Sequence, residues 1–285
     1  MNWITKFTLV ACGILAIAGT KALAHISYTG RDFGTVDSTT YGSIDLSGVR
    51  SSTISNQTAT SLFGWADATD ADWGDSHRVR VFRFTLANSL AADQSVRITA
   101  ERNLLGTGPT GTFLPAFSLF KGLAHTTSPL AHDSSALSVE WLVNQFGSGN
   151  GSGLGGSGKE GSFNALGNWK IGNSVSQYDI DPLDTLKSFT YIGNAADGIL
   201  ANYGSAAGIF GDGNADGYLT ATFTGLAAGD YSLFVGGANY AAQTTEVPTK
   251  SYGVNVTVGL VPEPSTGSLL LGGAALLGLL RRRRG

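Results

Sequence analysis

Cysteine is almost missing from this chain. The 285 residues include one, Cys12, and it lies in the first apolar segment. If that segment is removed after export, the mature protein can form no disulfide, no thiolate nucleophile and no cysteine-based metal site. An exported protein of this kind must rely on burial of its core, or on bound ions, for stability.

Charged residues are also few, at 14% of the chain. Six of the 18 Lys and Arg residues lie in the two ends, which leaves twelve against 21 acidic residues and a net charge of about −9 for the remainder. A nucleic-acid partner would need basic side chains to neutralise its phosphates, so this balance argues against one. It is compatible with divalent cations.

The N-terminal apolar run has the features of a secretory signal peptide, 1–24. Lys6 gives the positive start, Phe7–Ala18 is the apolar stretch, and Ala22 and Ala24 form an A-x-A site for signal peptidase, leaving His25 as the mature N-terminus. An alternative is a lipoprotein box, since Leu9–Cys12 has that pattern. Few apolar residues precede Cys12, however, and the apolar stretch continues beyond it.

The C-terminal segment, 261–285, has three parts in order: Pro262-Glu263-Pro264, an apolar run over Ser268–Leu280, and the block Arg281–Arg284. Four arginines are costly to move across a bilayer, so they should stay on the cytoplasmic side and the body outside the inner membrane. As a helix, Thr266–Leu280 would span roughly 22 Å against about 30 Å of hydrocarbon. This short transmembrane helix fits a transient anchor better than the alternative, a permanent one.

These three parts resemble the PEP-CTERM sorting signal of Gram-negative bacteria. The resemblance covers about the last 24 residues and implies that exosortase, a membrane-embedded cysteine protease, recognises and cleaves the chain near the motif. It implies a transient stay at the inner membrane, followed by the cell surface or the extracellular space. The sorting-motif residues are Pro262, Glu263, Pro264, Arg281, Arg282, Arg283 and Arg284.

The body, 25–260, is predicted to be all-β. Gly accounts for 40 residues, and Ser, Thr, Ala and Asn are frequent. Alternating apolar and polar residues indicate short strands, and Phe33–Thr60 is expected to hold ragged ones. The clearest candidates are 78–86, 95–101, 113–120, 137–143, 188–192, 218–224, 231–235 and 252–258.

We therefore expect an antiparallel β-sandwich or jelly-roll-like domain with Gly/Ser-rich loops, flanked by the signal peptide and the transmembrane helix. Pro115 suggests that 113–120 is an edge strand or contains a bulge. The segment 147–158 (GSGNGSGLGGSG) reads as a flexible insertion within one domain. Phe82–Phe84, Gly229–Gly237 and Tyr252–Val256 also resemble a bacterial pre-peptidase C-terminal domain, which implies a small secreted β-sandwich.

One local motif is a candidate metal site. Asp212, Asn214 and Asp216 alternate, and Gly217 stands at the sixth position, as at the start of a calcium loop. Phe223 occupies the position where an EF-hand carries glutamate, so an EF-hand is excluded. Two interpretations stay open: a loop that binds Ca²⁺ and a plain Asp/Asn/Gly turn between strands.

An acidic loop lies within the first third of the chain. Four aspartates are interleaved with Trp65 and Trp73, and Arg78 and Arg80 could offset their mutual repulsion. Exposed tryptophan beside carboxylates could stack on a sugar ring; alternatively, the loop is solvated and its tryptophans are core anchors. The acidic residues are Asp67, Asp70, Asp72 and Asp75.

The sequence offers no convincing catalytic set. His132-Asp133-Ser134 lists the residue types of a triad, but neighbours in a chain diverge, and no nucleophile elbow accompanies them. We therefore expect a non-enzymatic exported protein, sorted by exosortase and associated with exopolysaccharide or biofilm matrix. The alternatives are a carbohydrate- or calcium-binding module and a hydrolase of matrix polymers, whose paired carboxylates only the fold could bring together.

Overall fold

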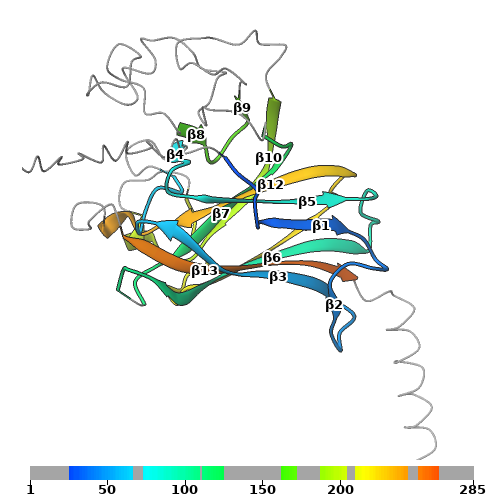
Figure 1. Ribbon diagram of the computed structural model, residues 1–285, viewed down its shortest axis with the longest axis horizontal. Coiled ribbons are helices and arrows are strands. Elements are labelled where there is room, and N and C mark those ends of the chain that lie inside the picture. The colour runs from blue at the N-terminus through cyan, green and yellow to red at the C-terminus, as the bar shows by residue number, and fades with distance from the viewer. Residues whose placement is uncertain are drawn as a thin grey trace, which may run out of the picture.

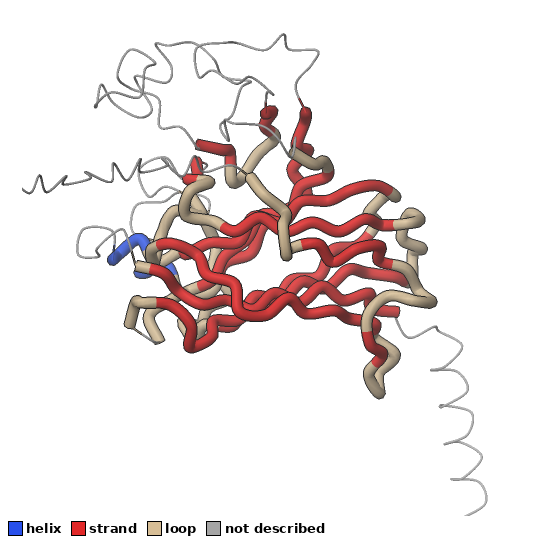
Figure 2. Tube along the Cα trace, viewed as in Figure 1, coloured by secondary structure: helices blue, strands red, loops and turns tan. Residues whose placement is uncertain are grey.

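Strands form the regular structure of the chain, apart from two short 3-10 turns, η1 (Leu200–Asn202) and η2 (Tyr240–Ala242), within the described residues (Figure 2). The computed structural model describes residues 26–66, 73–109, 111–124, 162–171, 187–203, 209–242 and 250–262. The expected strand at 137–143 and the insertion at 147–158 lie outside these ranges.

Two sheets stack face to face (Figure 1). The larger has six strands in the order β1 (Asp32–Val36), β5 (Arg80–Leu86), β12 (Gly229–Gly237), β7 (Pro115–Lys121), β10 (Lys187–Ala196) and β9 (Trp169–Ile171). The smaller has five in the order β11 (Tyr218–Thr224), β6 (Gln94–Gly106), β13 (Ser251–Pro262), β3 (Arg50–Thr60) and β2 (Ser43–Ile44). A short pair, β4 (Trp73–Asp75) and β8 (Ser162–Asn164), lies beyond the larger sheet.

The all-β sandwich is confirmed. Among the described strands, every pair is antiparallel except β1 with β5, which run parallel at one edge of the larger sheet. The expected alternation is also confirmed. Val96, Ile98 and Ala100 of β6 are fully buried and face the core between the sheets, as are Val254 and Val256 of β13.

The central strands of the six-stranded sheet, β12 and β7, are buried on both faces. Phe117 and Leu119 of β7 belong to the core between the sheets, whereas Ala116 and Phe120 belong to a second core on the outer face. This second core is largely aromatic, and its rings pack edge-on, tilted or stacked at centroid distances of 4.3 to 6.3 Å. Its principal rings belong to Trp65, Phe120, Phe163, Trp169, Phe189 and Phe234.

Two buried serines satisfy polar groups within this second core. Trp65 Nε1 donates to Ser118 Oγ at 2.8 Å, and Ser118 Oγ donates to the Ala165 carbonyl at 2.5 Å. Ser232 Oγ donates to the Gly122 carbonyl at 2.6 Å and lies 2.7 Å from Tyr28 Oη. These bonds join Ala165 and Tyr28 to serines of the sheet. They also leave none of these buried hydroxyl groups without a partner, which would cost stability.

Pro115 begins β7, which lies in the interior of the sheet between β12 and β10. The prediction of an edge strand was therefore wrong. Proline is tolerated at this position because the first residue of a strand need not donate to the ladder. Its carbonyl accepts the Asp197 N–H at 2.9 Å, which joins the start of β7 to the end of β10.

Candidate functional site

The last strand of the sandwich runs into the sorting motif. β13 pairs with β6 from Tyr252 to Pro262, and the final pairs are Val261 with Ser95 and Pro262 with Gln94. Pro262, the first residue of the motif, is therefore part of the sheet and 263–285 begins directly after it. The other sorting-motif residues lie outside the described residues, as does the signal peptide with Ala22 and Ala24.

Among the described residues, no helix is both long enough and apolar enough to cross a membrane. The transmembrane helix expected within 261–285 falls after Pro262, outside the described part of the chain.

The candidate calcium loop is a hydrogen-bonded turn between β10 and β11. Asp212 Oδ1 accepts the N–H of Asn214 at 3.0 Å and that of Gly198 at 3.3 Å, and Asp216 Oδ1 accepts the Tyr218 N–H at 3.0 Å. These are Asx-type contacts, by which an aspartate replaces a missing backbone partner. Across the described ranges, no three His, Cys, Asp or Glu side chains are placed so that they could hold a metal ion.

A fourth residue, Asp197, holds this loop in place, and the sequence reasoning missed it. Its side chain is fully buried. Asp197 Oδ2 accepts the Gly217 N–H at 2.7 Å, and Oδ1 accepts the Asp216 N–H at 3.3 Å. The available signal was a lone acidic residue directly after β10, between Ala196 and Gly198.

The surroundings of Asp197 disfavour the ionised form of its carboxyl group. Burial raises the pKa of Asp197 to about 6, and the neighbouring charges of Asp212 and Asp216 act in the same direction. The backbone N–H donors of Gly217 and Asp216 oppose this rise without cancelling it. The same surroundings raise the pKa of Tyr203, chiefly through burial and further through Asp197 and Asp212.

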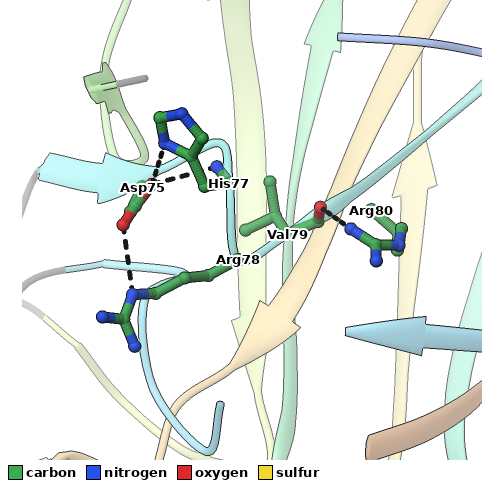
Figure 3. Close-up of polar contacts among 5 residues, drawn as sticks. All are labelled: Asp75, His77, Arg78, Val79 and Arg80. Atoms are coloured by element: carbon green, nitrogen blue, oxygen red, sulfur yellow. Dashed lines mark hydrogen bonds and ion pairs between the residues drawn. The ribbon is translucent and has the colours of Figure 1, made fainter. Parts of the chain in front are cut away.

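The acidic loop contributes one carboxylate to the described structure, Asp75, at the end of β4 (Figure 3). Asp75 Oδ1 lies 2.9 Å from His77 Nδ1 and accepts the His77 N–H at 2.9 Å, while Oδ2 accepts from Arg78 Nε at 3.1 Å. Burial opposes ionisation, but the His77 contacts and the Arg78 charge together lower the pKa of Asp75.

The two arginines of this segment differ in role. Arg78 offsets the Asp75 charge, as expected, and its guanidinium lies 4.5 Å from the centroid of the Phe63 ring. Arg80 instead donates to the Val79 carbonyl at 3.2 Å and lies away from Asp75 (Figure 3). Asp67, Asp70 and Asp72 lie outside the described residues.

Trp65 is a core anchor rather than a sugar-stacking platform. It is fully buried, its indole N–H is bonded to Ser118, and Gly236 packs against its Cα and Cβ. Trp65 is therefore not available to stack on a sugar ring, and Trp73 is left as the other candidate. Trp73 lies in β4, and its side chain is outside the description. His25, His125 and the His132-Asp133-Ser134 run also lie outside it.

The sandwich and its C-terminal junction define a class: an all-β domain that passes without a linker into a C-terminal signal. The family model described as the PEP-CTERM protein-sorting motif matches residues 260–284. The chain thus carries a PEP-CTERM sorting motif, which marks an exported protein with a transient membrane anchor and with exosortase as its processing partner.

The comparison with curated proteins gave no match. Among solved structures, the sandwich is similar to CorA, described as a surface-associated copper-binding protein important in copper acquisition by Methylomicrobium album BG8. The two share 14% sequence identity, the match covers 72% of this chain and 92% of CorA, and the TM-score is 0.43. A likeness of this degree says nothing about the ligand of the present chain. The resemblance to a pre-peptidase domain stays a prediction.

Proposed function

We propose that this protein is a non-enzymatic β-sandwich that exosortase delivers to the cell surface or the extracellular matrix, where it associates with exopolysaccharide. The observation that carries the proposal is the junction at Pro262. The sorting motif starts inside the β6–β13 ladder. Anchoring or cleavage of the motif therefore anchors or releases the folded sandwich directly, with no linker between them.

The junction also constrains processing. Pro262 is held opposite Gln94 in the sheet, and a protease needs an extended, accessible backbone. Cleavage on the C-terminal side of Pro262 leaves the ladder intact, whereas cleavage before it would require the end of β13 to detach. We therefore expect the mature C-terminus to retain Pro262.

Fractionation of cells tests the proposal. The full chain is expressed in a host with a functional exosortase and in the same host without it. With exosortase, the sandwich should be found at the surface or in the matrix. Without it, the protein should accumulate uncut in the inner membrane. Glu263→Ala with Pro264→Ala should reproduce the second result, and Tyr218→Ala on exposed β11 is the matched control.

The exopolysaccharide part of the proposal has its own test. In a bacterial strain that exports and cleaves the protein but makes no exopolysaccharide, the mature sandwich should appear in the medium instead of the matrix. Equal retention in both hosts would refute the association with exopolysaccharide and leave export and sorting untouched.

A calcium-binding module is the second candidate function. In its favour, three aspartates gather at one loop and burial disfavours the charge of Asp197. Against it, Asp212 and Asp216 already accept backbone N–H groups of their own turns. Thermal unfolding with CaCl₂ and with EDTA decides between these roles, since a bound ion raises Tm. A hydrolase of matrix polymers remains a prediction that no contact among the described residues supports.

A further inference from the structure

The end of the sandwich at which the chain passes to the sorting motif also carries a projecting hairpin (Figure 1). β2 and β3 form it, with Ser43 opposite Ser51 and Ile44 opposite Arg50. Two aliphatic side chains of this hairpin are in water: Ile44 is 60% exposed and Leu46 is fully exposed. Single exposed aliphatic residues are common on proteins, so exposure alone does not mark a binding surface; the fixed conformation and the location of these two do.

The tip of the hairpin is a defined turn. Asp45 Oδ1 accepts from the Ser47 N–H at 2.8 Å, the Ser47 hydroxyl at 2.6 Å and the Val49 N–H at 3.1 Å. The Gly48 N–H donates to the Asp45 carbonyl at 3.0 Å, and Gly48 has φ of +83°, a conformation that suits glycine. Leu46 is thus presented by a turn that Asp45 closes through hydrogen bonds within the turn, and both Asp45 and Leu46 are exposed.

The tip lies beside the exit of the chain. Leu260 of β13 is opposite Arg50, directly after the hairpin turn. A Cβ placed on Gly48 would lie 3.6 Å from the Pro262 side chain. The hairpin and the first residue of the sorting motif therefore occupy the same corner of the sandwich.

The distance to the bilayer is short. From Pro262 to Ser268, where the apolar run begins, there are six residue steps, which span at most about 20 Å when fully extended. The anchor therefore draws this corner, and no other, towards the lipid headgroups. Arg97 lies close enough to Asp45 for its charge to contribute, after the Ser47 hydrogen bond, to the lowered pKa of that carboxyl. Arg97 and Arg50, whose Nε donates to the Ser38 carbonyl at 2.9 Å, supply positive charge next to the tip and to the negative charge of Asp45 itself.

We propose that the tip of this hairpin, Ile44 to Gly48, inserts into the interface of the inner-membrane leaflet that faces away from the cytosol while the chain is anchored. Ile44 and Leu46 would enter the boundary between headgroups and acyl chains, and Arg50 and Arg97 would face lipid phosphates. The proposal rests on the proposed function, because it needs the anchor. Its consequence is a second attachment point, which fixes the orientation of the sandwich before exosortase acts.

The test uses the full chain in vesicles of phosphatidylethanolamine and phosphatidylglycerol. Cys12→Ser removes the one natural cysteine, and Leu46→Cys accepts a polarity-sensitive fluorophore. The matched control is Leu104→Cys, because Leu104 is 85% exposed. It lies on β6 ten residues from Gln94, the partner of Pro262, and is therefore roughly 33 Å along the strand from the start of the sorting motif. We expect a blue shift and quenching by spin-labelled lipid at 46 and neither at 104; Ile44→Ser should reduce the effect at 46.

Flotation of the vesicles separates the possible failures. If the chain does not float with the lipid, both the anchoring in the proposed function and the hairpin insertion are refuted. If the chain floats and the label at 46 stays in water, only the insertion is refuted, which is also the result expected if the tip contacts a protein such as exosortase. If labels at 46 and 104 both enter lipid, the sandwich has no preferred orientation and the proposal fails.

Discussion

Replacing Asp197 by Asn should change how the stability of the sandwich depends on pH. The folded pKa of Asp197 is about 6, against 3.8 for an ordinary aspartate. Because the folded value is raised, the folded state keeps its proton over a range in which the unfolded chain has lost it. Stability from this group is therefore complete below pH 3.8 and is lost as pH rises through about 6.

The magnitude follows from the shift. Each unit of pKa difference corresponds to about 1.4 kcal/mol. Between pH 4.5 and 7.5, linkage gives a loss of about 2 kcal/mol for the wild-type residue. Asparagine occupies nearly the same volume, can still accept one of the two backbone N–H groups, and does not titrate. The free energy of unfolding of Asp197→Asn, relative to wild type, should therefore rise by about 2 kcal/mol over this interval.

Urea unfolding at a series of pH values measures this difference. EDTA in every buffer removes any contribution from a cation, and Asp93→Asn, an exposed substitution on the turn before β6, serves as the control. The lowered pKa values of Asp75 and Asp37 cancel in the comparison, since both proteins contain them. If the free energies of unfolding of wild type and Asp197→Asn change in parallel with pH across the whole range, ionisation of the buried carboxyl group costs no stability and the reasoning is refuted.

Three further predictions concern the core, a tight contact and the cation. Phe234→Ala removes a ring from the centre of the second core and should cost about 3–5 kcal/mol of unfolding free energy in urea, whereas exposed Tyr218→Ala should change it by less than about 0.5 kcal/mol. Gly237→Ala should destabilise the fold in the same assay, because the new Cβ would lie 2.3 Å from the Leu62 carbonyl oxygen; an unchanged midpoint would contradict this. CaCl₂ should leave Tm unchanged because the turn already uses its carboxylates, and a calcium-dependent rise that Asp212→Asn abolishes would overturn that reading.

The period of two in the sequence was enough to place most strands. Segment 218–224 coincides with β11, and the alternation in β6 and β13 identifies the side chains that meet between the sheets. This works because a half-buried strand exposes every second residue to water. The sequence could not show that β6 extends to Gly106, since its last residues are exposed and carry no apolar pattern.

The second core could be recognised only in part. β7 (PAFSLFK) and β12 (GDYSLFVGG) lack clean alternation, which is the signature of strands buried on both faces. What covers the outer face comes from short segments far apart in sequence, such as Phe163 in β8 and Trp169 in β9. Three-residue strands have too few positions for a period to be detected.

The candidate sites depended on contacts across the fold. The acidic motif at 212–217 was visible as a turn or a calcium loop, but the choice between them depends on Asp197, which lies fifteen residues before Asp212 and directly after β10. Likewise, Trp65 could be read as exposed or buried until its hydrogen bond to Ser118 placed it in the core. The sorting signal was recognisable from sequence because its three parts are contiguous and need no tertiary contact.

Mass spectrometry of the mature protein tests the central claim most directly. The protein is recovered from the surface or matrix of cells that contain exosortase, and both of its ends are determined. We expect an N-terminus at His25 and a C-terminus that retains Pro262 and lacks Arg281–Arg284. An intact 285-residue chain in the cytosol, with both ends uncut, would contradict the assignment of this sandwich as an exported, sorted protein.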